Sequence, residues 1–197
     1  MDPIKLDTNG DNLEKIKKFL IKIFLWLYKL VSSFIIRNIQ KKSKIIHLKK
    51  MSKIELINIT NNSNHKTCYI NQAFLERDKG IVNDRYYNHY KNKKEQVTLI
   101  NLEEIDAFNK NIGENLDYKD FRRNIIISGI NLSKYINKKI IIKNVVLKIQ
   151  ELCQPCNYLQ KKLGISNLVK MLVNKSGVRA EIISSGFISV GDKIKIY

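Results

Sequence analysis

The run IIIKNVVLKI, residues 140–149, decides the fold of this 197-residue chain. It is the most strand-like run in the sequence, because β-branched residues dominate it. The pair Lys143-Asn144 interrupts the run and predicts a hairpin, or a bent strand pair, over 139–152. Two of the three cysteines follow in ELCQPCN, residues 151–157. This thiol pair comes directly after a strand, and Pro155 lies between the two cysteines. It is the first candidate for a chemically active site in this chain.

Working outward, residues 51–197 contain many short apolar or alternating runs separated by glycine and asparagine turns. Many short strands with glycine corners and few helices favour a compact β-barrel. The predicted strands are 53–59, 67–70, 96–101, 124–128, 178–184, 187–190 and 193–197. The predicted short helices are 102–110, 158–163 and 166–173.

Composition and charge set outer limits on function. Hydrophobic residues make up 44% of the chain, which is enough for a core and excludes wholesale disorder. The net charge of +18 fits nucleic acid, an anionic membrane surface or a phosphorylated ligand, or else lysines that only decorate the surface. The sequence argues against nucleic acid as the partner, since no basic cluster is interleaved with aromatic residues. Three cysteines, an odd number, argue against a disulfide framework.

Residues 1–50 differ from the rest of the chain and are predicted to be a separate N-terminal extension. The window FLIKIFLWLYKLVSSFII, residues 19–36, is the most apolar in the sequence. On a helix its lysines join a narrow polar stripe opposite a broad apolar face, which suits a helix lying in a membrane interface. A signal-anchor, a targeting peptide and a soluble packed helix are the alternatives. The expected location is therefore membrane-associated or organelle-targeted, and otherwise cytoplasmic.

Four interpretations fit the CQPC segment. A structural zinc site needs four ligands, but there is no second CxxC, and His47, His65 and His89 are scattered. A thioredoxin-like redox pair needs its first cysteine to open a helix in a βαβ setting. A purely structural pair is the third. The favoured interpretation is a reactive thiolate at Cys156, because the start of the following helix would stabilise the thiolate. A thiolate suits a molybdenum-type metal or a transferable sulfur atom.

Two segments place an arginine beside an aromatic residue and a polar partner. They are DRY, residues 84–86, and FRRN, residues 121–124. Arginine binds phosphate in a bidentate manner, so two converging arginines would hold a phosphorylated cofactor. The alternative is a surface ion pair or a solvated face.

Five segments then follow one another in a fixed order: GIVNDRY (80–86), VTLI (97–100), FRRNIIISGINL (121–132), Pro155-Cys156 and GVRAEIISSGFISVGD (177–192). Together they resemble the MOSC domain, the C-terminal module of molybdenum cofactor sulfurases and of small stand-alone proteins. The resemblance covers residues 51–197, about three quarters of the chain. Asn83 stands where the family's GDRY motif has glycine, and asparagine tolerates the left-handed conformation.

The resemblance implies a mainly β fold: a MOSC-like β-barrel with a few short helices at 51–197, preceded by an amphipathic or hydrophobic helix. It also implies molybdenum cofactor (molybdopterin) as ligand. Cys156 is then the functional cysteine, acting as a metal ligand or a persulfide sulfur carrier, while Cys153 is a resolving or an incidental thiol. The implied cofactor-binding residues are Asp84, Arg85, Tyr86, Arg122 and Asn124.

The resemblance leaves the activity open between a sulfur transferase and an oxidoreductase, the latter a reductase of N-hydroxylated substrates. The expected partner is a sulfur donor such as a cysteine desulfurase, or an electron-transfer protein. Pyridoxal phosphate binding is a family-level association only: it comes from the sulfurases, whose aminotransferase-like desulfurase domain is not found in this sequence. A membrane-tethered, non-catalytic binding protein, in contact with the membrane through residues 19–36, is the alternative from another functional class.

Overall fold

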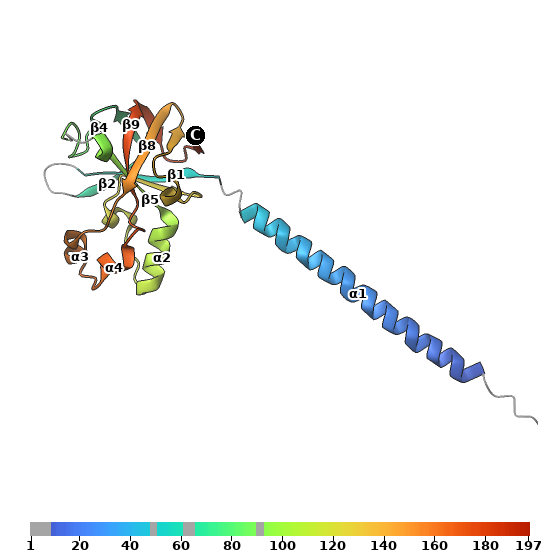
Figure 1. Cartoon of the computed structure of the whole chain (residues 1–197). Helices are drawn as coiled ribbons and strands as arrows, with labels where there is room; N and C mark the ends of the chain where they lie inside the picture. The colour runs from blue at the N-terminus through green and yellow to red at the C-terminus, as the bar shows by residue number, and fades with distance from the viewer. Residues whose placement is uncertain (1–8, 48–50, 61–65, 90–92) are drawn as a thin grey trace, which may run out of the picture. The chain divides into compact units, whose positions relative to one another are not determined.

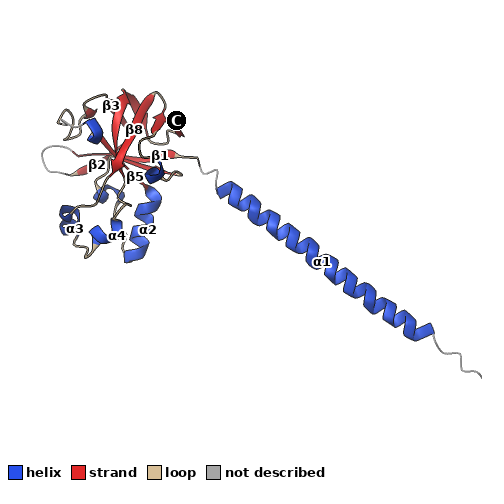
Figure 2. Cartoon of the chain, in the orientation of Figure 1, coloured by secondary structure: helices blue, strands red, loops and turns tan. Residues whose placement is uncertain are grey.

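A computed structural model describes residues 9–47, 51–60, 66–89 and 93–197 (Figure 1). The chain divides into two compact units, Met1–Lys50 and Met51–Tyr197. In the first unit the described element is a single helix, α1 (Asn9–His47). The second unit carries the strands and the remaining helices (Figure 2).

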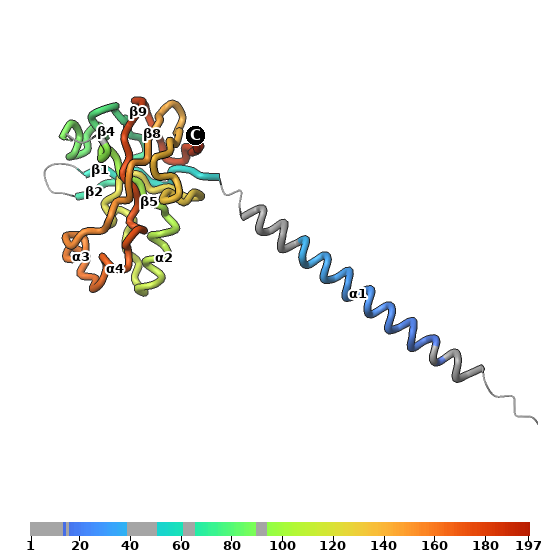
Figure 3. Tube along the Cα trace, viewed as in Figure 1, coloured from blue at the N-terminus to red at the C-terminus, as the bar shows by residue number. Residues whose placement is uncertain are grey.

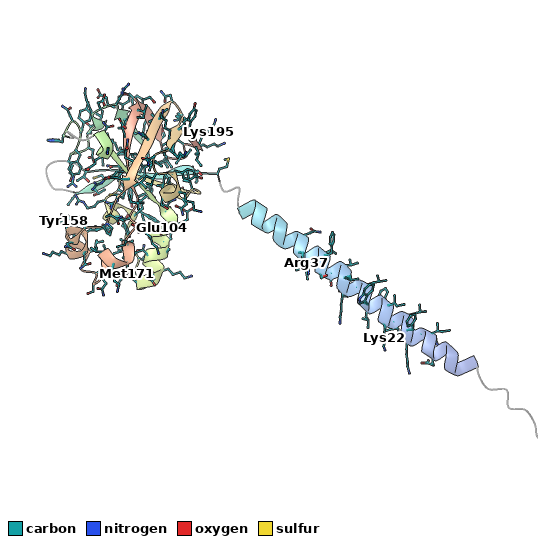
Figure 4. All side chains as sticks on the ribbon, viewed as in Figure 1. Lys22, Arg37, Glu104, Tyr158, Met171 and Lys195 are labelled. Carbon is teal, nitrogen blue, oxygen red and sulfur yellow. The ribbon has the colours of Figure 1, made fainter. Side chains whose placement is uncertain are left out.

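Helix α1 presents apolar side chains to its surroundings along most of its length. Between Ile16 and Asn38 the exposed side chains include Phe24, which is 71% exposed, and Trp26, which is 62% exposed. Lys22 and Arg37 project from the same helix (Figure 4). The predicted N-terminal helix is therefore present, and its apolar residues are not buried by the rest of their own unit.

The second unit is built from two sheets, a larger mixed one and a smaller antiparallel one. The larger one has eight strands in the order β11-β7-β8-β9-β5-β6-β1-β2, and the smaller one has the order β10-β3-β4. The strands of the larger sheet are β1 (Lys53–Thr60), β2 (Thr67–Ile70), β5 (Val97–Asn101), β6 (Ile125–Ser128), β7 (Lys139–Ile142), β8 (Val145–Leu152), β9 (Val178–Ser184) and β11 (Ile194–Ile196). The smaller sheet contains β3 (Gln72–Glu76), β4 (Gly80–Ile81) and β10 (Gly186–Ser189).

The large sheet curls until β1, the strand next to one edge, approaches β11 at the other edge. The start of β1 meets the segment before β11, where Ile54 N donates to Asp192 O at 2.9 Å and Gly191 N donates to Ile54 O at 2.8 Å. No continuous strand ladder is found there among the described residues, only the isolated bridge between Lys53 and Lys193 and the backbone hydrogen bonds around it. The predicted mainly β fold is confirmed, although no closed barrel is found among the described residues.

Strands β5 and β6 form the one parallel pair in the described sheets, and helix α2 (Leu102–Ile112) connects them. A parallel pair needs such a crossover, because a tight turn can only reverse the chain. Side chains alternate between the two faces of these strands. Ile125 and Ile127 therefore enter the main core, whereas Ile126 enters a second core under the helices. This double burial explains the unbroken isoleucine run of β6.

The helices lie together at one end of the unit (Figures 1 and 2). They are α2, α3 (Asn157–Leu163) and α4 (Leu168–Leu172), and the 3-10 turn η2 (Tyr118–Phe121) belongs to the same region. Their second core contains Phe108 and Phe121, whose rings meet edge to face with centroids 5.7 Å apart. This core fixes η2 and α3 beside the sheet, and both contribute residues to the site described next.

The hairpin predicted over 139–152 is present as β7 and β8, with Lys143 in the left-handed conformation at the corner (φ 53°). Most other predicted elements are found within two residues of their expected bounds. Strands β3 and β4 were not predicted.

Candidate functional site

One edge of the large sheet gathers the ends of five strands. Strands β5 and β6 are parallel, so Thr98 and Asn124 lie at the same edge. Strand β1 runs antiparallel to β6, which brings the end of β1 to that edge. Arg179 of β9 pairs with Thr98 and therefore lies there as well. Strand β8 ends here too, where Cys153 N donates to Gly177 O at 2.8 Å. The chain then continues into α3 (Figure 3).

A cavity of about 580 Å³ opens at this edge, and we call it the main cavity. All six residues predicted for the site line it: Asp84, Arg85, Tyr86, Arg122, Asn124 and Cys156. They come from three segments that are far apart in the sequence. The other residues that line it include Thr60, Glu95, Thr98, Arg123, Cys153, Tyr158 and Arg179.

Asp84 holds the DRY segment against the end of β1. Its carboxylate accepts hydrogen bonds from Thr60 N at 2.9 Å and from Tyr86 N at 3.1 Å. Arg85 N donates to Thr60 O at 2.9 Å. The turn before it depends on Asn83 in the left-handed conformation (φ 68°), as the sequence predicts. Asp84 therefore positions its neighbours.

Asn124 joins three strands at the base of the cavity. Its Oδ1 accepts hydrogen bonds from Thr98 N at 3.1 Å and Thr98 Oγ1 at 2.8 Å, and its Nδ2 donates to Asn58 O at 3.4 Å. Thr98 lies in β5 and Asn58 in β1, so this one side chain bridges the strands on both sides of β6. Asn124 thus shapes the base of the cavity.

Four arginines line the cavity against two carboxylates, Asp84 and Glu95, so it carries a net positive charge. Two of the four are held by protein groups. Arg123 donates to Ser176 O and Ser176 Oγ, each at 2.7 Å, and burial lowers the pKa of its guanidinium. Arg179 Nη1 lies 3.0 Å from both Glu95 and Glu151.

The surroundings of Arg179 favour its charged form. Burial by itself lowers the pKa of Arg179, but the nearby Cys153 thiol and the Glu95 and Glu151 carboxylates outweigh that effect and raise it. The guanidinium thus remains charged beside a buried thiol.

Arg122 is the arginine best placed for a ligand. Its Nη1 is buried and makes no hydrogen bond with any residue that the structure describes. A buried guanidinium nitrogen without an acceptor is costly, and an anion in the cavity would satisfy it. Arg122 adopts the left-handed conformation (φ 55°) as the residue that ends η2. Its guanidinium lies 5.6 Å from the centre of the Tyr158 ring.

The two thiols of CQPC differ in accessibility. Cys153 is 5% exposed, whereas Cys156 is exposed and lies directly before α3 as its N-cap residue. The first cysteine does not open the helix, so the arrangement differs from that of a thioredoxin-like pair. No group of three or more His, Cys, Asp or Glu side chains gathers within the described ranges, which leaves the zinc interpretation without support there.

Sequence reasoning assigned no role to Arg123, Arg179, Glu95 or Tyr158. Arg179 occupies a polar position in the alternating run VRAEI, and its register partner across β8 is Glu151. Opposite charges at such a cross-strand pair could have been anticipated once the β8–β9 pairing was known. That pairing depends on the tertiary fold, which the local sequence pattern does not reveal.

These features define a sheet-dominated domain with a cationic, thiol-bearing cavity at one sheet edge. A family model for the MOSC domain matches residues 85–195, more than half of the chain. The chain therefore belongs to the MOSC domain family, a family associated with the molybdenum cofactor. No curated protein matches it.

Solved structures show the same fold. The YuaD protein from Bacillus subtilis superposes with a TM-score of 0.64 at 16% identity, over 74% of this chain and 95% of that one. YiiM from Geobacillus stearothermophilus gives 0.59 at 13% identity, over 74% and 75% of the two chains. YiiM from Escherichia coli gives 0.59 at 14% identity, over 74% and 69%. At these identities the likeness concerns the fold alone.

Proposed function

We propose that the main cavity binds molybdenum cofactor and that Cys156 acts there as a metal ligand or as a persulfide sulfur carrier. One observation carries the proposal: the exposed Cys156 thiol lines the same cationic cavity as Arg122, whose buried Nη1 makes no hydrogen bond with the residues that the structure describes. A ligand with a phosphate at one end and a soft metal at the other needs this combination.

The residues present fit such a ligand. Arg122 and Arg85 would hold the phosphate, and both line the cavity of about 580 Å³. Asp84 and Asn124 would keep these groups in place through their bonds to Thr60 and Thr98. When bound, the cofactor would supply a metal centre for sulfur or electron transfer at the cavity. The sulfur donor or the electron-transfer partner would be a separate protein.

Arg122→Met tests the phosphate contact, because methionine retains much of the side-chain length and removes the charge. We expect pterin content per chain to fall roughly tenfold, as for the loss of a charged phosphate contact of about 1.5 kcal/mol. Oxidation of the purified chain to its fluorescent pterin product measures this. Arg77→Met is the matched control, because Arg77 is exposed and does not line this cavity. Equal pterin in the Arg122 variant and the wild type would contradict the proposed contact.

Helix α1 supports a second proposal, membrane association of this chain. Ile16–Asn38 is long and apolar enough to cross a membrane, which needs about 20 residues. Exposed large apolar side chains cover this segment. Leaving them in water would forfeit the free energy that their burial in lipid provides. The lysines of the segment would extend toward the anionic headgroups.

Phe24→Glu with Leu27→Glu tests the membrane proposal. Each acidic residue near the middle of such a segment costs about 3 kcal/mol of insertion free energy. We expect the wild-type chain to stay with the membrane pellet after alkaline washing and the double variant to move to the soluble fraction. Val173→Glu with Tyr197→Glu, at exposed apolar positions of the second unit, should leave the chain in the pellet. A soluble wild-type chain would refute membrane association.

A further inference from the structure

A second cavity of about 630 Å³ adjoins the main one, and we call it the lysine cavity. It belongs to no function assigned above. The groups that matter are three lysines, one carboxylate, one exposed thiol and one tyrosine. They are Lys66, Lys119, Lys162, Asp120, Cys68 and Tyr158.

Three segments line both cavities and so place them side by side. The β1–β2 hairpin gives Thr60 to the main cavity and Thr67 to the lysine cavity, and the two hydroxyl oxygens lie 3.3 Å apart. In and after the η2 turn, Lys119 and Asp120 line the lysine cavity, whereas Phe121 and Arg122 line the main cavity. Tyr158, in α3, lines both. Figure 4 labels this side chain.

Arg122, the arginine proposed to bind the phosphate, lies at the boundary between the two cavities. Arg122 lies 5.6 Å from the centre of the Tyr158 ring, which is 58% exposed. An anion held at Arg122 would therefore lie next to the ring that the lysine cavity shares. A ligand could pass this ring from one cavity to the other.

The charge of the lysine cavity is positive and only partly compensated. Lys119 Nζ pairs with Asp117 at 2.7 Å, and the Asp120 carboxylate accepts a hydrogen bond from Asp117 N at 3.2 Å. Within the described part of the chain, Lys66 and Lys162 have no carboxylate partner. Two uncompensated ammonium groups beside a phosphate-binding arginine favour a second anionic group on the same ligand.

We infer that the lysine cavity binds a second phosphate, linked to the phosphate held at Arg122. The ligand is then of the diphosphate-ester class, such as a phosphorylated cofactor extended by a nucleotide, whose base would pack against the Tyr158 ring. The inference rests on the proposed function for the first phosphate. Lys66 and Lys162 are its binding residues, and the exposed Cys68 thiol is a reporter within the cavity.

Thiol alkylation tests this inference in the full-length chain, purified from a host that cannot make molybdenum cofactor. Iodoacetamide modification of Cys68 is followed by mass spectrometry at constant ionic strength. We expect inorganic tripolyphosphate to slow this modification roughly threefold or more and orthophosphate to leave it unchanged. Lys66→Ala with Lys162→Ala should remove the protection, and so should Arg122→Met. Lys138→Ala with Lys195→Ala, which removes the same charge from outside both cavities, should retain it.

Several results would overturn the inference. They are an unchanged Cys68 rate with tripolyphosphate, equal protection by orthophosphate, protection that survives in Arg122→Met, and protection lost in the control pair. The proposed function fails separately, through its molybdenum and pterin content. A wild-type chain without pterin that still shows lysine-dependent protection would overturn the cofactor and leave the diphosphate assignment standing.

Discussion

Cys156→Ala is expected to lower the molybdenum bound per chain roughly tenfold or more. Changes to residues that merely support a metal ligand already cost about 10- to 100-fold in metal affinity, so loss of a thiolate ligand should cost at least as much. Metal analysis of the full-length chain, produced in a host that makes molybdenum cofactor, measures the effect. Cys68→Ala removes another exposed thiol, from the neighbouring lysine cavity, and should leave molybdenum unchanged.

The same variant separates the two roles proposed for Cys156. A persulfide carrier contains sulfur that cyanide releases as thiocyanate, whereas a plain metal ligand does not. Loss of cyanide-labile sulfur with molybdenum unchanged would contradict the ligand role and support the carrier role. If Cys156→Ala keeps both its molybdenum and its cyanide-labile sulfur, Cys156 has neither proposed role. Cys153, buried beside Arg179, would then be the remaining candidate thiol in the main cavity.

Gly177→Ala is expected to cause the largest loss of stability of any single methyl addition considered. A Cβ at this position would lie 2.1 Å from Leu99 O, a backbone atom of β5 that cannot move independently of the sheet. The backbone also has φ +95°, a conformation that alanine rarely adopts. We expect the free energy of unfolding to fall by roughly 3–5 kcal/mol.

Urea unfolding followed by far-ultraviolet circular dichroism measures this change. Tryptophan fluorescence is unsuitable, because the single tryptophan, Trp26, lies in α1, outside the second unit. Gly113→Ala is the matched control: its φ is also positive at 71°, but a Cβ there meets nothing within 4 Å. This control should cost about 1 kcal/mol. Equal losses in the two variants would show that the close approach to Leu99 is not the cause.

Gly177 also links stability to the site. Its carbonyl accepts the hydrogen bond from Cys153 N, and Ser176 beside it accepts both hydrogen bonds from Arg123. The close approach that excludes a side chain at Gly177 thus places a thiol and a buried arginine at the cavity wall. We attribute the glycine at this position to that geometry.

Local sequence patterns predicted much of the fold, since the β7–β8 hairpin and β2 follow from apolar runs and turn residues. They did not predict β4, because a two-residue strand has no periodicity to detect. They also could not show that the sheet stops short of closure. The single bridge between Lys53 and Lys193 joins residues from opposite ends of the domain.

The candidate site was predicted through family resemblance more than through residue chemistry. On spacing alone Arg85 and Arg122 were as consistent with a solvated surface as with a cavity. Their convergence required the pairing of β1 with β6 and the bond between Asp84 and Thr60. The lysine cavity could not be predicted either, because Lys66 and Lys162 are almost a hundred residues apart and meet only through the placement of α3.

The most direct test of the cofactor proposal is the molybdenum and pterin content of the full-length wild-type chain, made in a host that synthesises the cofactor. Elemental analysis and pterin fluorescence after oxidation give both quantities on one sample. The proposal predicts molybdenum and pterin in equal amounts, approaching one of each per chain. A chain that contains neither would contradict stable cofactor binding at the main cavity.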